Sequence, residues 1–368
     1  MTSRKQVRWG ILGTGWVAQR FMADLHGVGD AESSAVASRT ESRAQEVAAR
    51  FGMRRAHASY KALLEDPELD VVYVATAPHE HAEHCLAALH NGKHVLCEKP
   101  FAVSVQEATA IIETARSAGL FCMEAMWTRF LPAIIDTIHH IDAGDIGVPQ
   151  VLMADFGIPV ADSGSSRLFD WARGGGSLLD RGVYAISLAV CLFGKPQRVW
   201  SHANLSASGS DAAVSAILEF ADSKSAVIGA SLTAYSGNEA VIAGSAGRIR
   251  IHEPFYRAER VTISRAPTVV ATKQSDFDPG SLKEQARRLI SRAKPYLPAD
   301  IRRSTVLRYP IHGYGYGYEA AEVVRCLREG LTESPVLPLH NSLLTMETIQ
   351  KIRQQIAHDG ANDGVQSA

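Results

Sequence analysis

Two stretches of the chain, far apart in the sequence, carry side chains that could exchange protons with a substrate. In the first stretch, Glu98 and Lys99 follow a short apolar run and precede Pro100. In the second, Asp180 and Tyr184 lie four residues apart, a spacing that places both on one face of a helix. Of these residues, Lys99, Asp180 and Tyr184 are the first candidates for acid–base chemistry.

Lys99 follows a predicted strand, at the kind of position where α/β proteins bind ligands. The run from His94 to Cys97 has the β-branched and apolar composition of a buried strand. Pro100 restricts Lys99 to extended conformations, so the backbone is stiff where it leaves the sheet. Ligands of open α/β sheets lie outside the carboxyl ends of the strands, which predicts that Lys99 faces this crevice. The alternative is a lysine in a surface turn, and the nucleotide-binding pattern nearby argues against it.

A glycine-rich turn near the N-terminus has the pattern that binds dinucleotides. Val7–Leu12 is a predicted buried strand, and a helical run to Leu25 follows the turn. Within the G-x-G-x-x-A pattern, Gly13 permits the turn, Gly15 lets the backbone approach a pyrophosphate, and Ala18 allows close helix packing. We expect the cofactor to contact five residues of this turn: Gly13, Thr14, Gly15, Trp16 and Val17.

The end of the second predicted strand indicates which dinucleotide binds. This strand, Glu32–Ala37, lies about 20 residues after the turn, where NAD-binding folds carry an acid for the ribose hydroxyls. Here Ser38, Arg39 and Thr40 take that place, and Arg43 follows one turn into the next helix. A carboxylate would repel a 2′-phosphate, whereas a hydroxyl and two guanidiniums would bind it. The sequence therefore predicts NADP, with NAD as the alternative. An ordinary helix N-terminus with solvated arginines is the competing explanation.

Further cofactor contacts are expected at the ends of the next strands. The strand Asp70–Thr76 is followed by a cluster of His79, His81, His84 and Cys85. This cluster lacks the HExxH spacing, and no second cluster completes a tetrahedral site, so we expect no metal. We expect four residues in this region to contact the cofactor: Thr76, His81, Glu98 and Lys99.

The pattern of predicted strands and helices divides the chain into two domains. Strands alternate with helices over residues 1–125, which is typical of a doubly wound parallel sheet and predicts an N-terminal Rossmann domain that binds NADP. From Gln197 to Ser264 apolar residues recur with a period of two. Residues 126–368 are therefore predicted to form a second domain with a mostly antiparallel sheet. The family resemblance given below implies that this is an α/β domain with a large open sheet, for substrate binding and oligomerisation. Its last helices, near 318–330 and 341–357, are expected to pack back on the Rossmann domain.

Composition excludes several classes of protein. The net charge is -1, which gives no global attraction to nucleic acid or anionic membranes. The 5 cysteines are scattered and never in CxxC spacing, which favours a reducing, cytoplasmic location. We find no apolar signal region and no membrane-spanning run in the sequence. The segment Gly313–Tyr318 (GYGYGY) is interpreted as a connection to the last helices rather than a base-stacking site.

Together, these motifs resemble a known family. They occur in the order and spacing of the glucose–fructose oxidoreductase/inositol dehydrogenase (Gfo/Idh/MocA) family: GTGWVA at 13–18, PHEH at 78–81, GKHVLCEKP at 92–100 and GGGSLLDRGVY at 174–184. The similarity covers nearly the whole chain, and EKP combined with the glycine–Asp–Gly pattern is specific. Many members carry histidine where this chain has Tyr184. The tyrosine, with EAMWTRF at 124–130 and the segment 318–339, is similar to the dihydrodiol dehydrogenase/D-xylose dehydrogenase branch.

The resemblance implies pyridine-nucleotide redox chemistry on a sugar or vicinal diol. The cofactor takes the hydride, and the protein orients the substrate and handles the proton. Tyrosine titrates near pH 10, and a lysine cation within about 4–6 Å favours tyrosinate, so we expect Lys99 to lower the pKa of Tyr184. Asp180 would hold Lys99 or bind a substrate hydroxyl, which makes these three residues the predicted catalytic set. Substrate contacts are expected from Trp127, Arg129, Asp180 and Tyr184, with Arg129 serving either substrate or cofactor.

Two other functions stay open on the sequence. One is a ketoreductase acting on a nucleotide-linked deoxysugar, whose diphosphate could bind the basic segment 266–312. The other is a ligand-sensing regulator, because the family includes a galactose-regulon repressor. Retention of the EKP motif and of Asp180 with Tyr184 argues against the regulator.

Two features of the second half concern surfaces. The segment 281–312 contains eight basic residues and only two acidic ones. Within it, Ser281–Ala293 can form an amphipathic helix. A solvated insertion helix is favoured over a lid or interface that faces an anionic ligand. The strand around Val227 carries apolar residues on both faces, and an apolar face in water predicts a homodimer or homotetramer. The family resemblance also implies a dimer contact through the outer face of this sheet.

Overall fold

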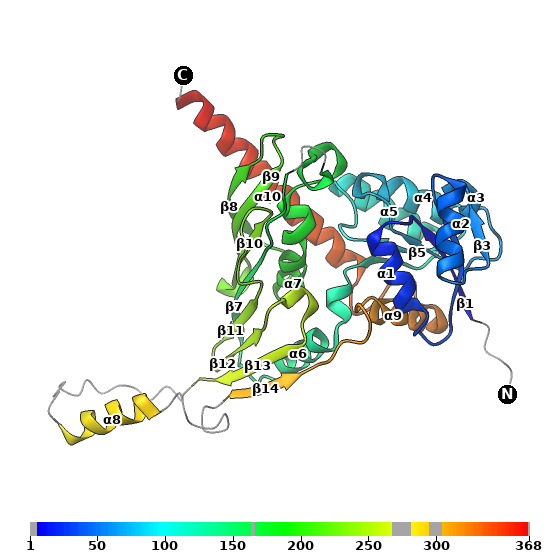
Figure 1. The fold of residues 1–368 in the computed structure, drawn as a ribbon. Helices are drawn as coiled ribbons and strands as arrows, with labels where there is room; N and C mark the ends of the chain where they lie inside the picture. Colours follow the sequence, from blue (N-terminus) through cyan, green and yellow to red (C-terminus); the bar gives the residue numbers. More distant parts are fainter. Residues whose placement is uncertain (1–5, 163–165, 267–280, 294–303, 367–368) are drawn as a thin grey trace.

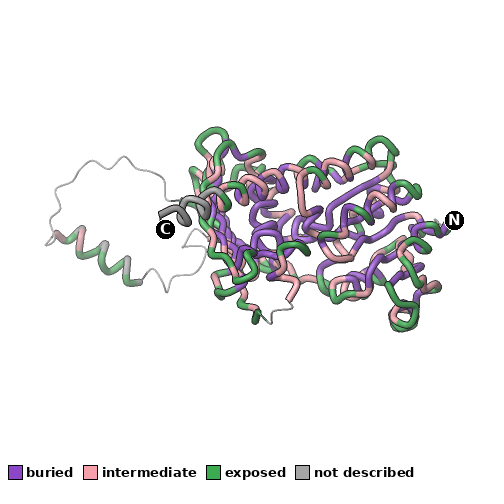
Figure 2. Tube along the Cα trace, turned by 90° about the horizontal axis from the view of Figure 1, so that it is seen from above, coloured by how far each residue is buried: buried purple, intermediate pink, exposed green. Residues whose placement is uncertain are grey.

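The computed structural model describes residues 6–162, 166–266, 281–293 and 304–366. Within these ranges the chain forms two sheets that lie side by side, with helices between and around them (Figure 1). Buried residues concentrate along the two sheets, whereas the outer helices and loops are exposed (Figure 2).

The first sheet is parallel throughout and has the strand order β3-β2-β1-β4-β5-β6. Its strands are β1 (Val7–Leu12), β2 (Ala31–Ala37), β3 (Arg55–His57), β4 (Val71–Val74), β5 (His94–Glu98) and β6 (Cys122–Ala125). Its helices are α1 (Trp16–Leu25), α2 (Glu41–Arg50), α3 (Tyr60–Leu64), α4 (His81–His90) and α5 (Val105–Ala118). The strand order reverses between β1 and β4, which is the point where such sheets bind ligands.

Two elements of this domain are very short. Tyr60–Leu64 is the helix α3, and the three-residue strand β3 precedes it. Ser59 begins this helix, because its hydroxyl accepts the backbone N–H of Ala62 at 3.2 Å. Three residues of strand and five of helix are too short to leave a periodic pattern in the sequence.

The second sheet has eight strands in the order β14-β13-β12-β11-β7-β10-β9-β8. They are β7 (Pro149–Gly157), β8 (Arg198–Leu205), β9 (Asp211–Glu219), β10 (Ser225–Ser231), β11 (Ala240–Gly244), β12 (Gly247–Ile251), β13 (Arg260–Arg265) and β14 (Ser304–Arg308). Only the β7–β10 pair is parallel among these described strands. The predicted fold class, a Rossmann sheet with a second, mostly antiparallel sheet, is confirmed.

Helices fill the space between the sheets. They are α6 (Pro132–Asp142), a π-helical turn η5 (Leu178–Gly182), α7 (Val183–Phe193), α9 (Gly317–Glu329) and α10 (Leu339–Gln366). Helix α7 packs on β7, β10 and α10. Helix α10 also contacts β8, α5 and β6, so it reaches both sheets, and α9 contacts α1, a helix of the first domain. The stretch Trp171–Phe193 is apolar enough to cross a membrane, but 78% of its most apolar window is buried in the structure.

One face of the second sheet is covered by helices and the other carries an apolar row. In β10, Ala226, Ile228 and Ala230 are buried, whereas Val227 on the opposite face is 45% exposed. Residues paired across five neighbouring strands continue this outer position: Trp200, Ile217, Val227, Met153 and Val241. We call these five residues the apolar row.

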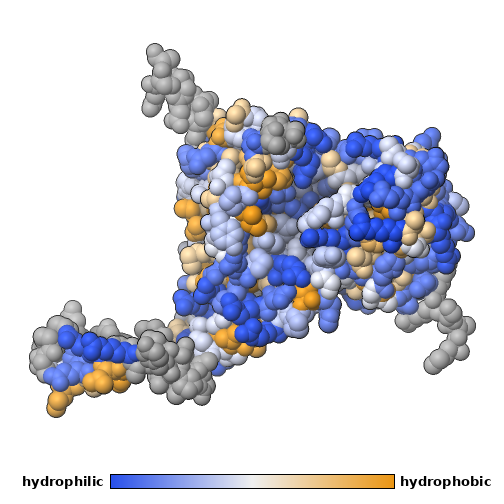
Figure 3. Space-filling model, viewed as in Figure 1, coloured by the Kyte–Doolittle hydropathy of each residue, from blue (hydrophilic) through white to orange (hydrophobic). Residues whose placement is uncertain are grey.

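Helix α8 (Leu282–Ala293) confirms the predicted amphipathic helix, and it projects away from the two sheets (Figure 1). Its apolar edge is exposed, and Leu282 is 85% accessible to solvent (Figure 3). Of the basic segment 266–312, residues 267–280 and 294–303 lie outside the described part of the chain.

Candidate functional site

A cavity of about 700 Å³ lies between the carboxyl ends of the first sheet and the elements that carry the second sheet. The surface is hollowed between these two parts of the molecule (Figure 3). The cavity is lined from α1, the ends of β4 and β5, the 3₁₀ turn η2 (Trp127–Phe130), η5, α7 and β7. The cavity therefore lies at the carboxyl ends of the strands, where Lys99 was predicted to lie.

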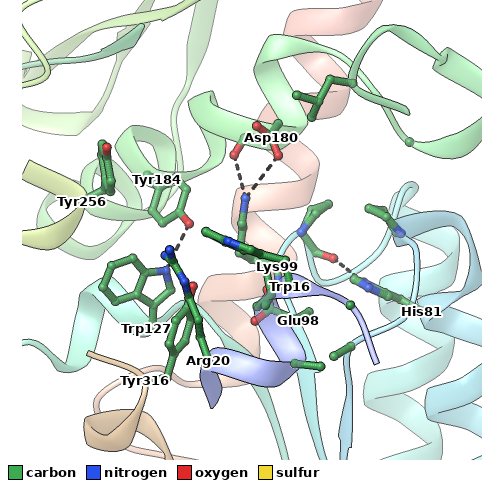
Figure 4. A pocket seen from close by; sticks show the side chains of 18 of the residues that line it. Trp16, Arg20, His81, Glu98, Lys99, Trp127, Asp180, Tyr184, Tyr256 and Tyr316 are labelled. Carbon is green, nitrogen blue, oxygen red and sulfur yellow. Dashed lines mark hydrogen bonds and ion pairs between the residues drawn. The ribbon is translucent and has the colours of Figure 1, made fainter. Parts of the chain in front are cut away.

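The three predicted catalytic residues meet in this cavity. Lys99 Nζ donates to the backbone oxygen of Asp180 at 2.8 Å and lies 3.5 Å from its carboxylate Oδ1 (Figure 4). The same ammonium lies 4.9 Å from the ring centroid of Tyr184. Trp127 Nε1–H donates to the Tyr184 hydroxyl oxygen at 3.1 Å. Lys99, which follows β5, and residues of η2, η5 and α7 thus form two bonded pairs, Lys99 with Asp180 and Trp127 with Tyr184, which the ammonium–ring contact joins.

The structure changes the expected protonation state of Tyr184. Its pKa is raised well above the usual value, mainly by burial; the hydrogen bond from Trp127 acts against the rise, and Glu98 and Asp180 add to it. The expectation that Lys99 lowers this pKa is wrong in the structure as it stands. Lys99 lies over the ring rather than at the hydroxyl, and its charge is paired with Asp180. Tyr184 therefore keeps its proton at neutral pH.

The two carboxyl groups in the cavity have pKa values shifted in opposite directions. Burial alone would raise the pKa of Asp180, but the charges of Lys99 and Arg167 help to lower it below its usual value. Burial raises the pKa of Glu98 to about 7, against the hydrogen bond from the Tyr73 hydroxyl and the charge of Lys99. Asp180 is thus the ionised partner of the lysine.

A carboxylate on β9 holds the start of the helix that carries Asp180 and Tyr184. Asp211 Oδ2 accepts the backbone N–H of Leu178 at 2.6 Å and the hydroxyl of Ser177 at 3.0 Å. Gly176, at φ +108°, leaves room for this carboxylate, since a Cβ there would lie 2.2 Å from Asp211 Oδ1. The glycine run before η5 therefore serves the contact that positions the helix.

A second cavity, of about 600 Å³, lies beside the glycine-rich turn and shares Gly15, Ala75 and Thr76 with the first. A Cβ on Gly13, at φ +106°, would lie 2.6 Å from the backbone oxygen of Ala75. A Cβ on Gly15 would meet no atom within 4 Å, so this residue faces open space at the start of α1. Trp16 and Val17 line the first cavity. The joined cavities fit a dinucleotide whose phosphates lie at the turn.

The residues predicted to select NADP lie beside the second cavity. Ser38 and Arg39 line it, together with Thr14, whose hydroxyl is 3.5 Å from that of Ser38. Arg43 is already engaged, because it pairs with Glu46 at 2.7 Å and its Nη2 lies 3.5 Å from the backbone oxygen of Thr14. The donor set fits a 2′-phosphate, with Arg39 as the better placed of the two arginines.

Thr76 and His81 connect the ends of β4 and β5. Thr76 lines both cavities, and its hydroxyl is 2.9 Å from Nδ1 of His84. His81 lines the first cavity but is almost completely buried, with its ring nitrogens 2.9 Å from Pro100 O and 3.3 Å from Thr76 O. Burial lowers the pKa of His81 to about 4. Both ring nitrogens face backbone oxygens, so this histidine positions the loops around the cofactor cavity.

The two predicted substrate residues on η2 lie in different places. Trp127 lines the cavity and packs against Tyr316 with ring centroids 5.1 Å apart. The structure does not bring Arg129 to the cavity. Its guanidinium donates to the backbone oxygens of Val336 at 2.9 Å and of Ser187 at 3.5 Å. Arg129 therefore joins η2 to α7 and to the segment before α10.

Several cavity residues escaped the sequence-based prediction. They include Arg20, Phe156, Arg167, Tyr256, Arg257, Tyr314 and Tyr316. The alternating GYGYGY run was a usable signal, because Gly315 at φ +102° would place a Cβ 3.0 Å from the Trp127 ring. Its glycine lets the two neighbouring tyrosines approach the cavity wall. Among the described residues no group of three His, Cys, Asp or Glu side chains could hold a metal ion.

The fold and the cofactor cavities define a class of protein, and comparison with known sequences agrees. Residues 7–126 match the oxidoreductase family with the NAD-binding Rossmann fold (GFO_IDH_MocA), and residues 137–250 match the GFO/IDH/MocA C-terminal domain. The chain belongs to the Gfo/Idh/MocA family, as its motifs predicted. It is an NAD(P)-dependent dehydrogenase or reductase, and the regulator alternative is set aside.

Among its relatives are trans-1,2-dihydrobenzene-1,2-diol dehydrogenases. The mouse enzyme is 33% identical over 95% of this chain and 97% of its own length, and the human enzyme is 32% identical with the same coverage. A solved structure of KijD10, a 3-ketoreductase from Actinomadura kijaniata in complex with NADP and TDP-benzene, is 25% identical and has a TM-score of 0.76. The match covers 95% of this chain and 98% of the KijD10 chain. Aldose–aldose oxidoreductase from Caulobacter crescentus shares the fold, with a TM-score of 0.78 at 20% identity over 96% of this chain and 98% of that chain.

Proposed function

We propose that the protein is an NADP-dependent oxidoreductase that transfers a hydride between the nicotinamide and a sugar-like or vicinal-diol alcohol or carbonyl. The observation that carries this proposal is the cluster of Lys99, Asp180 and Tyr184 beside the cofactor cavities. The similarity to enzymes named for a vicinal diol supports the substrate class. Sugar and diol substrates share adjacent hydroxyls, which polar groups in this cavity can bind.

The chemistry follows from the protonation states of the cluster. When bound, the nicotinamide supplies or accepts the hydride. Tyr184 accepts a hydrogen bond from Trp127, so its own proton is free to be donated to a substrate oxygen. Its raised pKa makes it a general acid for carbonyl reduction at neutral pH. Lys99, held by Asp180, would bind the same substrate oxygen and stabilise the negative charge that develops on it.

Selectivity for NADP rests on the second cavity. Ser38 and Arg39 line it, and neither offers a carboxylate to the ribose. A guanidinium binds a phosphate through two parallel hydrogen bonds, which a ribose hydroxyl cannot match. We infer that Arg39 is the main 2′-phosphate ligand and that Arg43 assists once it is released from Glu46.

The test is a substrate panel assayed with NADP(H) and NAD(H). Pentoses, hexoses, trans-cyclic diols and the corresponding carbonyl compounds are incubated with the enzyme, and reduced cofactor is followed by absorbance. We expect NADP-dependent turnover of at least one class that is lost in Lys99→Met, with Lys61→Met, an exposed lysine of α3, as the control. The proposal is rejected if no compound is turned over in either direction, or if Lys99→Met retains full activity.

A ketoreductase for a nucleotide-linked sugar is the second candidate. It is supported by the likeness to KijD10, which was solved with TDP-benzene. It is also supported by the arginines that line the first cavity, because a diphosphate needs cations. Turnover of keto-sugar nucleotides with no turnover of free sugars or diols would favour it.

We also propose that the chain assembles as a homodimer or homotetramer through the apolar row. Five large apolar positions in register on an exposed sheet face form a surface that water solvates poorly. The division into domains at residues 125 and 126 and the cytoplasmic location stay predictions. Four of the five free cysteines are buried, which is compatible with a reducing compartment.

A further inference from the structure

The first cavity carries more positive than negative charge. Its charged lining consists of four cations and two carboxyl groups: Arg20, Lys99, Arg167, Arg257, Glu98 and Asp180. One carboxylate is paired with Lys99, and burial raises the pKa of the other to about 7. Arg257 is paired with Glu259 at 2.9 Å. The guanidiniums of Arg20 and Arg167 have no hydrogen-bond acceptor within the part of the chain that the structure describes.

Two aromatic rings hold Arg20 in a defined position. Its guanidinium carbon lies 3.7 Å from the ring centroid of Trp16 and 4.8 Å from that of Tyr314. Asp24, one turn further along α1, is occupied by the backbone N–H groups of Tyr314 and Tyr316, each at 2.9 Å. These bonds hold Tyr314 beside α1, and no ion pair joins Asp24 to Arg20 in the described part of the chain. The guanidinium is therefore preorganised, while its N–H groups lack an acceptor among the described residues.

We propose that Arg20 binds an anionic group of the substrate, a carboxylate or a phosphate, and that the natural substrate is an acidic or phosphorylated sugar or diol. This inference rests on the proposed function. A guanidinium held near two aromatic rings offers its donors as a fork, which matches the oxygens of a carboxylate or phosphate. Arg167 adds a second positive charge to the same cavity.

The position of Arg20 favours the substrate over the cofactor as the source of the anion. The phosphates of a dinucleotide have their own place at Gly15, Ser38 and Arg39, which line the second cavity. Arg20 does not line that cavity. Figure 4 shows it in the first cavity with Trp127 and Tyr316, the residues that surround the Tyr184 hydroxyl. An anion bound there lies close to the reacting carbon.

The experiment measures binding to the enzyme–NADPH complex by calorimetry with matched probes: D-glucose, D-glucuronate, D-glucose 6-phosphate and UDP-glucose. We expect at least one anionic probe to bind roughly 10- to 100-fold more tightly than D-glucose, which is the range for a charged hydrogen bond. Arg20→Met should remove this difference while the affinity for NADPH stays unchanged, and Arg20→Lys should restore part of it. Arg50→Met is the matched control, because Arg50 also lies over a ring, that of Phe51, but outside both cavities.

The outcomes separate three cases. Selectivity for the carboxylate, the phosphate ester or the diphosphate identifies the source of the anion. Equal binding of neutral and anionic probes, or a difference that survives in Arg20→Met, overturns the inference. Weaker NADPH binding in Arg20→Met also overturns it, since Arg20 would then serve the cofactor. None of these results affects the proposed function, which fails only if Lys99-dependent turnover is absent from the substrate panel.

Discussion

At the scale of single residues, Arg39 should distinguish the two nicotinamide cofactors. Arg39→Ala is expected to raise the KM for NADP by about 10- to 100-fold, because a charged hydrogen bond contributes about 1.5–3 kcal/mol. The KM for NAD should change little, since NAD has no 2′-phosphate. Arg43→Ala should be milder, because Arg43 is already paired with Glu46. Equal losses for both cofactors in steady-state assays would contradict a 2′-phosphate at this position.

Tyr184 is expected to control the rate and its dependence on pH. Tyr184→Phe should lower kcat by about 10²–10⁴-fold, the usual contribution of a general acid, and leave the Kd for NADP unchanged. Because burial raises the pKa of this hydroxyl, the wild-type rate of alcohol oxidation should still be rising with pH above neutrality. The variant should lose that rise. Tyr235→Phe, which removes an exposed hydroxyl bonded to Glu253, should match the wild type.

The residues of the site were predictable where local sequence carries the information. Lys99 ends a strand before a proline, and Asp180 and Tyr184 have helical spacing, so their positions followed from near neighbours. Tyr314 reaches the cavity through a bond to Asp24, 290 residues away in the sequence, which no local pattern reveals. The position of Arg129 has a related cause, because Trp127 lines the cavity and Arg129 does not, and local sequence does not give the direction of each side chain on the 3₁₀ turn.

At the scale of elements, His81 should make the join between β4 and β5 sensitive to acid. The unfolded imidazole binds a proton below its ordinary pKa of 6.5, whereas the buried ring does so only below about 4. The contribution of His81 to the free energy of unfolding is therefore fully present above pH 6.5. It falls by about 3 kcal/mol as the pH drops toward 4. His81→Gln should flatten the pH dependence of the unfolding free energy, measured with urea across this window. An unchanged slope would mean that His81 does not titrate in this way.

The turn before η5 should tolerate no side chain at Gly176. Gly176→Ala is expected to cost at least about 3 kcal/mol of unfolding free energy and to lower kcat, because a Cβ would displace Asp211 and the helix that it holds. Gly92→Ala is the control, since Gly92 also has a positive φ but no atom within 4 Å of the added Cβ. That variant should lose only about 1 kcal/mol. Similar losses in both would show that backbone strain alone matters.

Elements were predicted best where they are long and periodic. Helix α5 is of this kind, because its apolar positions repeat along 14 residues. The order and register of the strands in the second sheet are harder to predict from the sequence. The strand around Val227 was predicted to carry apolar residues on both faces, and its parallel pairing with β7 depends on residues that lie far apart in the chain. Local patterns do not encode that choice of partner.

For the whole molecule, the apolar row should determine assembly. Ile217→Asp places a charge within the row, between Trp200 and Val227 in register, and is expected to yield monomers. Analytical ultracentrifugation at micromolar concentration measures this directly. Leu331→Asp, an exposed apolar position away from the row, should leave the assembly intact. A wild-type protein that sediments only as a monomer would contradict the proposed interface.

The position of Trp16 also gives the molecule an optical property. Its indole is 61% exposed and lines the first cavity, whereas Trp9 is fully buried in the core of the first sheet. Reduced nicotinamide absorbs at the wavelengths where indole emits. Its binding in the adjoining cavities should quench the emission of Trp16 and Trp127 and excite the cofactor by energy transfer. Cofactor occupancy can therefore be followed in the unlabelled protein by its own fluorescence.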